Sequence, residues 1–137
     1  MKKIMVLLAM FILLAGAANA LTPAIIGGIR DGAAVGLLLE DGVGKNFGIR
    51  FGIEADSGKQ PLIMNLGGKF YLTGLGKRSY LSFGVGVVAY SGDKTSAGVS
   101  ISFIINRAFD VTPLFAEIGA DIVDSPRLQA QMGFKLF

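Results

Sequence analysis

The sequence contains no cysteine and no histidine. Without cysteine, an exported chain of this size cannot be a small disulfide-stapled domain, so its sheet and its packing must stabilise it. The double absence also removes the Ser-His and Cys-His nucleophile pairs, the most common general base and the commonest zinc ligands. We therefore expect no enzymatic activity, no metal site and no cofactor. An enzyme that relies on Glu117 or Asp121 is the last-ranked alternative.

Long apolar runs and a strong net charge are also missing. Beyond the N-terminal segment, no stretch is apolar for the roughly 18 residues that a transmembrane helix requires. The formal net charge is +3 for the whole chain and falls to +1 without Lys2 and Lys3. This charge is too small to indicate a nucleic-acid partner.

The first twenty residues are typical of a secretory signal peptide. Lys2 and Lys3 form a positive start, residues 4–14 are apolar, and Ala18, Asn19 and Ala20 form a small-residue cleavage site. The apolar run is shorter than the about 20 residues that a spanning helix needs. No cysteine follows the site, which excludes a bacterial lipoprotein anchor. We expect cleavage after Ala20, with residues 21–137 forming one domain.

Large apolar residues alternate with small or polar ones through most of the remaining chain. In residues 46–56, for example, Phe47, Ile49 and Phe51 share one face while Gly48 and Arg50 share the other. This is the period of a β-strand with one apolar side. Turn signals rich in Gly, Asp, Ser, Lys or Pro separate such segments. They predict strands at 33–40, 46–56, 61–72, 79–91, 96–106, 113–123 and 127–137.

A short eighth strand is predicted at residues 24–30, where Gly27 and Gly28 weaken the pattern. An even number of strands is expected for a bacterial single-chain barrel. The alternative is seven strands preceded by an N-terminal segment. Eleven residues at about 3.3 Å each, tilted by about 45°, span roughly the 25 Å height of the apolar band of a transmembrane barrel.

The two faces of the predicted strands differ in composition. One face is large, apolar and uncharged, as at Val87 and Phe103, and the other is small and polar, as at Gly84 and Ser102. A soluble lipocalin-like barrel would cover its outside with charges, and this chain has too few of them on the polar face. Small residues suit the narrow interior of an eight-stranded barrel. We therefore predict an all-β, antiparallel, up-and-down transmembrane β-barrel.

Charged residues on the predicted inner face carry both signs. Buried charges need partners, so we expect a lumen ion-pair network. A proton or ion path through the barrel is the alternative. The candidates are Arg50, Lys69 and Lys135, set against Glu54, Glu117 and Asp121.

Together with the export signal, the strand pattern of residues 33–137 resembles the small outer-membrane β-barrels of the OmpA and OmpX type. The C-terminal aromatic residue, Phe137, is part of the resemblance. In that family such a residue is recognised by the barrel-assembly machinery. Here Phe137 is in phase with Lys135, whereas the family's terminal aromatic residue faces outward. The sequence also lacks tryptophan, so its aromatic girdles are thin.

The resemblance implies a protein of the bacterial outer membrane that contacts its lipids and the assembly machinery. Its expected role is structural or of limited permeability. Two alternatives are a secreted or periplasmic lipocalin-like barrel that binds an apolar ligand, and a small pore. Lys77 and Arg78 are expected in a solvated turn, with contact to lipid headgroup phosphates as the alternative.

Overall fold

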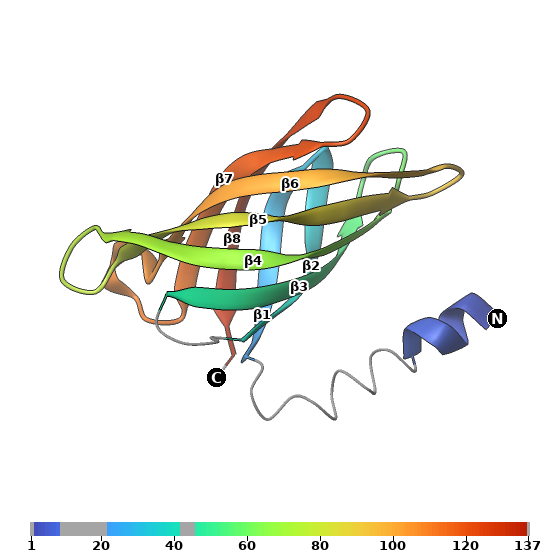
Figure 1. Cartoon of the computed structure of the whole chain (residues 1–137). Coiled ribbons are helices and arrows are strands. Elements are labelled where there is room, and N and C mark those ends of the chain that lie inside the picture. The colour runs from blue at the N-terminus through green and yellow to red at the C-terminus, as the bar shows by residue number, and fades with distance from the viewer. Residues whose placement is uncertain (1, 9–21, 42–45, 137) are drawn as a thin grey trace.

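The computed structural model describes residues 2–8, 22–41 and 46–136, and its strands form one closed antiparallel barrel in chain order (Figure 1). Residues 2–8 are helical, and no helix of the described residues is long and apolar enough to cross a membrane. The predicted cleavage site at Ala20 and the terminal Phe137 lie outside the described residues. The strands are β1 (Thr22–Arg30), β2 (Gly32–Asp41), β3 (Phe47–Asp56), β4 (Leu62–Gly74), β5 (Tyr80–Ser91), β6 (Thr95–Asn106), β7 (Leu114–Ile122) and β8 (Pro126–Lys135).

The predicted eight-stranded count is confirmed, and the weakest prediction, β1, is the strand that closes the barrel. It pairs antiparallel with β2 on one side and with β8 on the other. Gly28 has a φ of +152°, and a Cβ there would lie 2.3 Å from the carbonyl oxygen of Ala130. Glycine is therefore required where β1 approaches β8, which explains why this strand has a weak sequence pattern.

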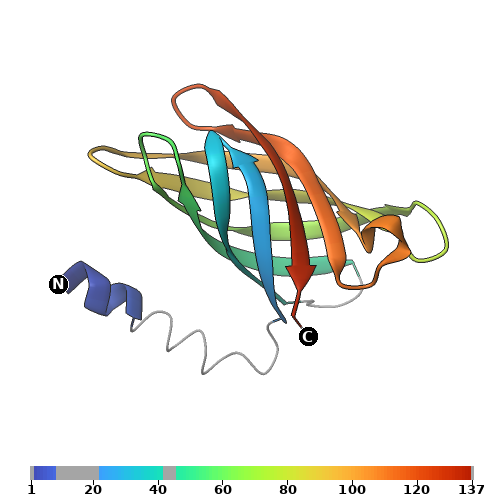
Figure 2. The ribbon, with the colours of Figure 1, turned by 180° about the vertical axis from the view of Figure 1, so that it is seen from behind.

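The connections divide between two ends of the barrel (Figures 1 and 2). At the end where β1 begins and β8 ends, hereafter the terminal end, the described connections are residues 75–79 and 107–113. The opposite, hairpin end has the single residue Asp31 and residues 57–61, 92–94 and 123–125. The longest described connection, residues 107–113, thus lies at the terminal end. A short 3-10 helix, η1 (Ala108–Asp110), lies within the connection between β6 and β7.

The predicted sorting of the two faces is confirmed. Val87 is 60% exposed and Ile118 57% exposed on the outside of the barrel. Ser102 and Gln129, on the inward parity of their strands, are 4% and 1% exposed. The large apolar side chains therefore point outward, and the small and polar ones fill the interior.

The interior also holds apolar side chains, which the polar inner pattern did not predict. Phe115 of β7 lies inside, opposite Gly133 of β8. A Cβ at position 133 would lie 2.1 Å from the Phe115 ring, so the glycine leaves the space that the ring occupies. Two interior apolar clusters result: one of Ala24, Ile26, Leu38, Ile104 and Phe115, the other of Ile63, Val88 and Tyr90.

Candidate functional site

The barrel interior contains two groups of charged side chains joined by ion pairs. Among the described residues, these two groups pair four cations with four carboxylates, so the formal charges of the two groups cancel. We name the groups after their arginines. The Arg30 cluster consists of Arg30, Glu54 and Asp121, and the Arg50 cluster of Arg50, Glu40, Glu117, Lys69 and Lys135.

The Arg30 cluster is shut off from solvent. Arg30 Nε donates to Asp121 Oδ2 at 2.7 Å and Nη2 donates to Asp121 Oδ1 at 3.0 Å, a bidentate pair. Its Nη1 donates to Glu54 Oε2 at 3.2 Å, and the Tyr90 hydroxyl donates to Asp121. Asp121 is 0% exposed and Glu54 1%. The cluster joins residues of β1, β3, β5 and β7 across the barrel.

The Arg50 cluster lies nearer the terminal end. Arg50 Nε donates to Glu40 Oε1 at 2.8 Å, and its Nη2 donates to Glu117 Oε1 at 2.7 Å. The Lys69 and Lys135 ammonium groups lie 3.3 Å and 3.6 Å from Glu40 Oε2. The register places Glu40 directly opposite Arg50 across the β2–β3 ladder. This pair is therefore fixed by strand pairing, while Glu117 is reached across the lumen.

Two buried glutamines of β8 connect the clusters. The Gln129 amide donates to Glu117 Oε2 at 2.8 Å and to Gln131 Oε1 at 3.2 Å. The Gln131 amide in turn donates to Glu54. The two clusters therefore belong to one continuous hydrogen-bonded network.

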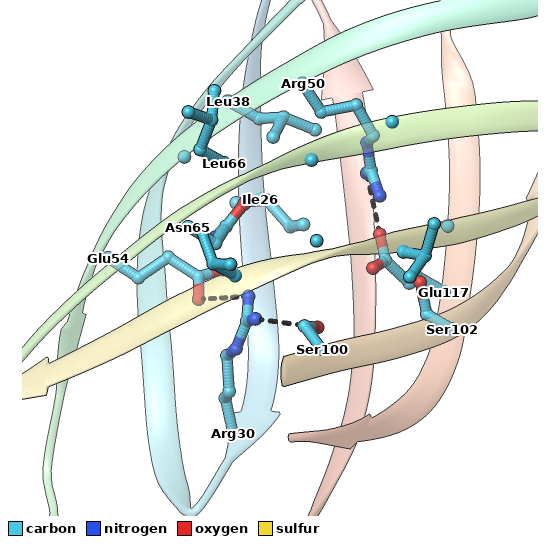
Figure 3. A pocket seen from close by; sticks show the side chains of 17 residues that line it. Ile26, Arg30, Leu38, Arg50, Glu54, Asn65, Leu66, Ser100, Ser102 and Glu117 are labelled. Carbon is cyan, nitrogen blue, oxygen red and sulfur yellow. Dashed lines mark hydrogen bonds and ion pairs between the residues drawn. The ribbon is translucent and has the colours of Figure 1, made fainter. Parts of the chain in front are cut away.

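The cavity between the clusters is small, and Figure 3 shows the side chains that line it. The cavity lined by Arg30, Arg50, Glu54 and Glu117 has a volume of about 30 Å³. This is room for about one water molecule. A larger pocket of about 150 Å³ lies at the terminal end, and its lining includes Arg50, Glu40, Lys69 and Lys135. The free space inside the barrel is thus larger at the terminal end, whereas side chains fill the interior at the level of Arg30 and Arg50.

All six predicted interior charges belong to this network, but some of their partners differ from the predicted ones. Glu54 and Asp121 pair with Arg30, which the sequence did not single out. Arg50 and both lysines share Glu40, which was also missed. Phe137, the predicted assembly signal, lies outside the described residues.

The signals for the two missed residues were weak for identifiable reasons. Glu40 follows three consecutive leucines, which hide the alternation of β2, and it precedes an acidic turn. Every second residue from Ala34 through Leu38 faces the interior, and continuing this alternation places Glu40 inside the barrel. Arg30 is the last residue of the glycine-containing β1 and looks like part of a turn.

The network has the chemistry of a structural core. Its carboxylates already accept hydrogen bonds from arginine, lysine, tyrosine or glutamine donors, and the adjoining cavity has no room for a substrate beside Glu117. Among the described residues, no group of three or more acidic side chains is placed to hold a metal ion. What the arrangement can do is neutralise buried charge and hold strands together across the lumen.

Comparisons with protein-family models, curated proteins and solved structures find no match for this chain. The features that bear on function are therefore the outer surface and the interior of the barrel itself.

Proposed function

We propose that this chain is an integral outer-membrane β-barrel of the OmpA and OmpX-like type. Residues 1–20 direct its export, and its own interior side chains block its lumen. Its role in the bacterial envelope is structural, with at most limited permeability. The observation that carries the proposal is the apolar belt on the outside of the barrel.

The belt surrounds the whole circumference, because each of the eight strands contributes exposed large apolar side chains. In water, exposed apolar patches rarely exceed a few hundred Å², whereas the hydrocarbon core of a membrane solvates such a surface. Closure of the barrel also satisfies the backbone groups that an open sheet would leave unpaired in lipid. Representative belt residues are Ile25, Val35, Ile49, Leu66, Val87, Phe103, Ile118 and Leu128.

The filled interior distinguishes this proposal from the lipocalin-like alternative. A carrier of an apolar ligand needs a pocket of about 300 Å³ or more with mostly apolar walls. The central cavity here measures about 30 Å³ and borders Arg30 and Arg50. The pocket at the terminal end is larger but borders two lysines and Glu40. Neither space suits an apolar guest.

Heat-modifiable migration tests the proposal. The mature chain should be recovered in the outer-membrane fraction and should run faster on an SDS gel before boiling than after it. N-terminal sequencing should begin at Leu21. Recovery of the folded chain from the periplasm without detergent would contradict the membrane assignment and favour the soluble barrel.

A further inference from the structure

The β4–β5 and β6–β7 connections form one unit at the terminal end (Figure 2). The Arg78 backbone N–H donates to Asp110 Oδ1 at 3.2 Å. The Ser79 hydroxyl donates to the Arg107 carbonyl oxygen at 2.6 Å. We call residues 75–79 and 107–111 the paired turns. These contacts hold two segments that lie about thirty residues apart in the sequence against each other.

The paired turns present apolar side chains outward. Phe109 is 85% exposed, Leu75 50% and Val111 45%. Phe109 has a φ of 55°, with Arg107 at 52° and Asp110 at 59°. Positive φ is uncommon for residues other than glycine, and for a bulky aromatic residue it is an outlier. The turn thus has an unfavourable backbone geometry at Phe109, whose side chain is exposed outside the barrel.

Three cations lie in the same two turns as these apolar side chains. Lys77, Arg78 and Arg107 are exposed, and the one carboxylate within the paired turns, Asp110, is engaged by the turn contacts. The hairpin end has the opposite balance, with more carboxylates than cations. Its connections, as bounded above, contain Asp31, Asp93 and Asp124 against Lys59 and Lys94.

The order of these groups along the barrel matches the edge of a membrane. The outward apolar belt continues through Leu72 and Ile105 at the ends of β4 and β6. Leu75 and Phe109 come next, and the cations lie beside them in the same turns. Aromatic side chains favour the membrane interface, and Lys and Arg near it bind lipid phosphates.

We propose that the paired turns bind the headgroups of anionic phospholipids, with Phe109, Leu75 and Val111 in the interfacial layer and Lys77, Arg78 and Arg107 against the phosphates. This inference rests on the proposed membrane function. To that function it adds the class of lipid that is bound and the end of the barrel that binds it.

Single-tryptophan variants test the inference, because the chain has no tryptophan of its own. Phe109→Trp reports on the paired turns and Phe103→Trp on the belt. Each mature, full-length variant is folded into vesicles in which the bromine is carried, at the same fraction, either by phosphatidylglycerol or by phosphatidylcholine. We expect quenching of the tryptophan at position 109 to increase about twofold when phosphatidylglycerol carries the bromine and to fall again in high salt, which screens exposed charges.

Charge variants identify the groups responsible. In the Phe109→Trp background, Lys77→Gln with Arg78→Gln should abolish the response to phosphatidylglycerol. The matched control, Lys59→Gln with Lys94→Gln at the hairpin end, should leave the response intact. Both pairs remove two exposed positive charges.

The outcomes separate the two proposals. If bromolipids quench the tryptophan at position 103, and the one at 109 responds equally to both vesicle types, the barrel is inserted and headgroup binding is overturned. If the tryptophan at 103 is not quenched, the membrane proposal itself fails, and headgroup binding with it. A response of the 109 variant to inorganic phosphate without vesicles would overturn the lipid assignment in favour of a small-anion site.

Discussion

Arg30 is 3% exposed and pairs with two buried carboxylates, Glu54 and Asp121, which would both lose their cation if its charge were removed. Arg30→Met should lower the free energy of unfolding by about 3–5 kcal/mol, because removing one partner leaves the others charged and buried. Urea titration of the folded barrel, followed by circular dichroism, measures this change. Adding Glu54→Gln and Asp121→Asn should recover much of the loss, and no recovery would contradict the ion-pair explanation.

On the outer face, Ile118 lies near the middle of β7 and is 57% exposed. Ile118→Arg should cost about 2–4 kcal/mol in lipid vesicles, because a cation is then placed in hydrocarbon. The control Thr95→Arg, at the end of β6, should have little effect. Equal stability of the two variants would indicate that the outer face meets water, as in a soluble barrel.

Within the strands, glycines determine where bulky interior groups fit. Gly133→Ala should lower the free energy of unfolding by about 1–3 kcal/mol, because the Phe115 ring occupies the space of the added methyl group. Adding Phe115→Leu should restore part of the loss. Gly76→Ala is the matched control, since a Cβ at position 76 meets no atom within 4 Å. Denaturant unfolding of the three variants gives the comparison.

The strands were predictable from sequence to the extent that each has one uninterrupted apolar side. The clear alternation of β3 fixed both its bounds and the inward position of Arg50 and Glu54. The Arg30 pairs could not be predicted, because Asp121 lies 91 residues away in sequence and meets Arg30 only through the curvature of the closed sheet. The inward Phe115 was also missed, since its fit depends on a glycine of the neighbouring strand.

For the whole barrel, the two arginine clusters and the small central cavity predict a closed lumen. We expect planar-bilayer recordings of the purified wild-type protein to show no discrete conductance, because side chains fill the path at the level of Arg30 and Arg50. A membrane-inserted general porin provides the positive control. Reproducible single-channel steps from the wild-type chain would favour the pore alternative and contradict the plugged interior.

The Arg30 cluster joins strands that are not neighbours in the sheet, since Arg30 of β1 meets Glu54 of β3 and Asp121 of β7. The contact with Asp121 requires β1 to be docked on β8, the pairing that closes the barrel. Interactions absent from the folding transition state slow unfolding while leaving the folding rate nearly unchanged. We therefore expect the cluster to slow unfolding and so to lengthen the lifetime of the closed barrel.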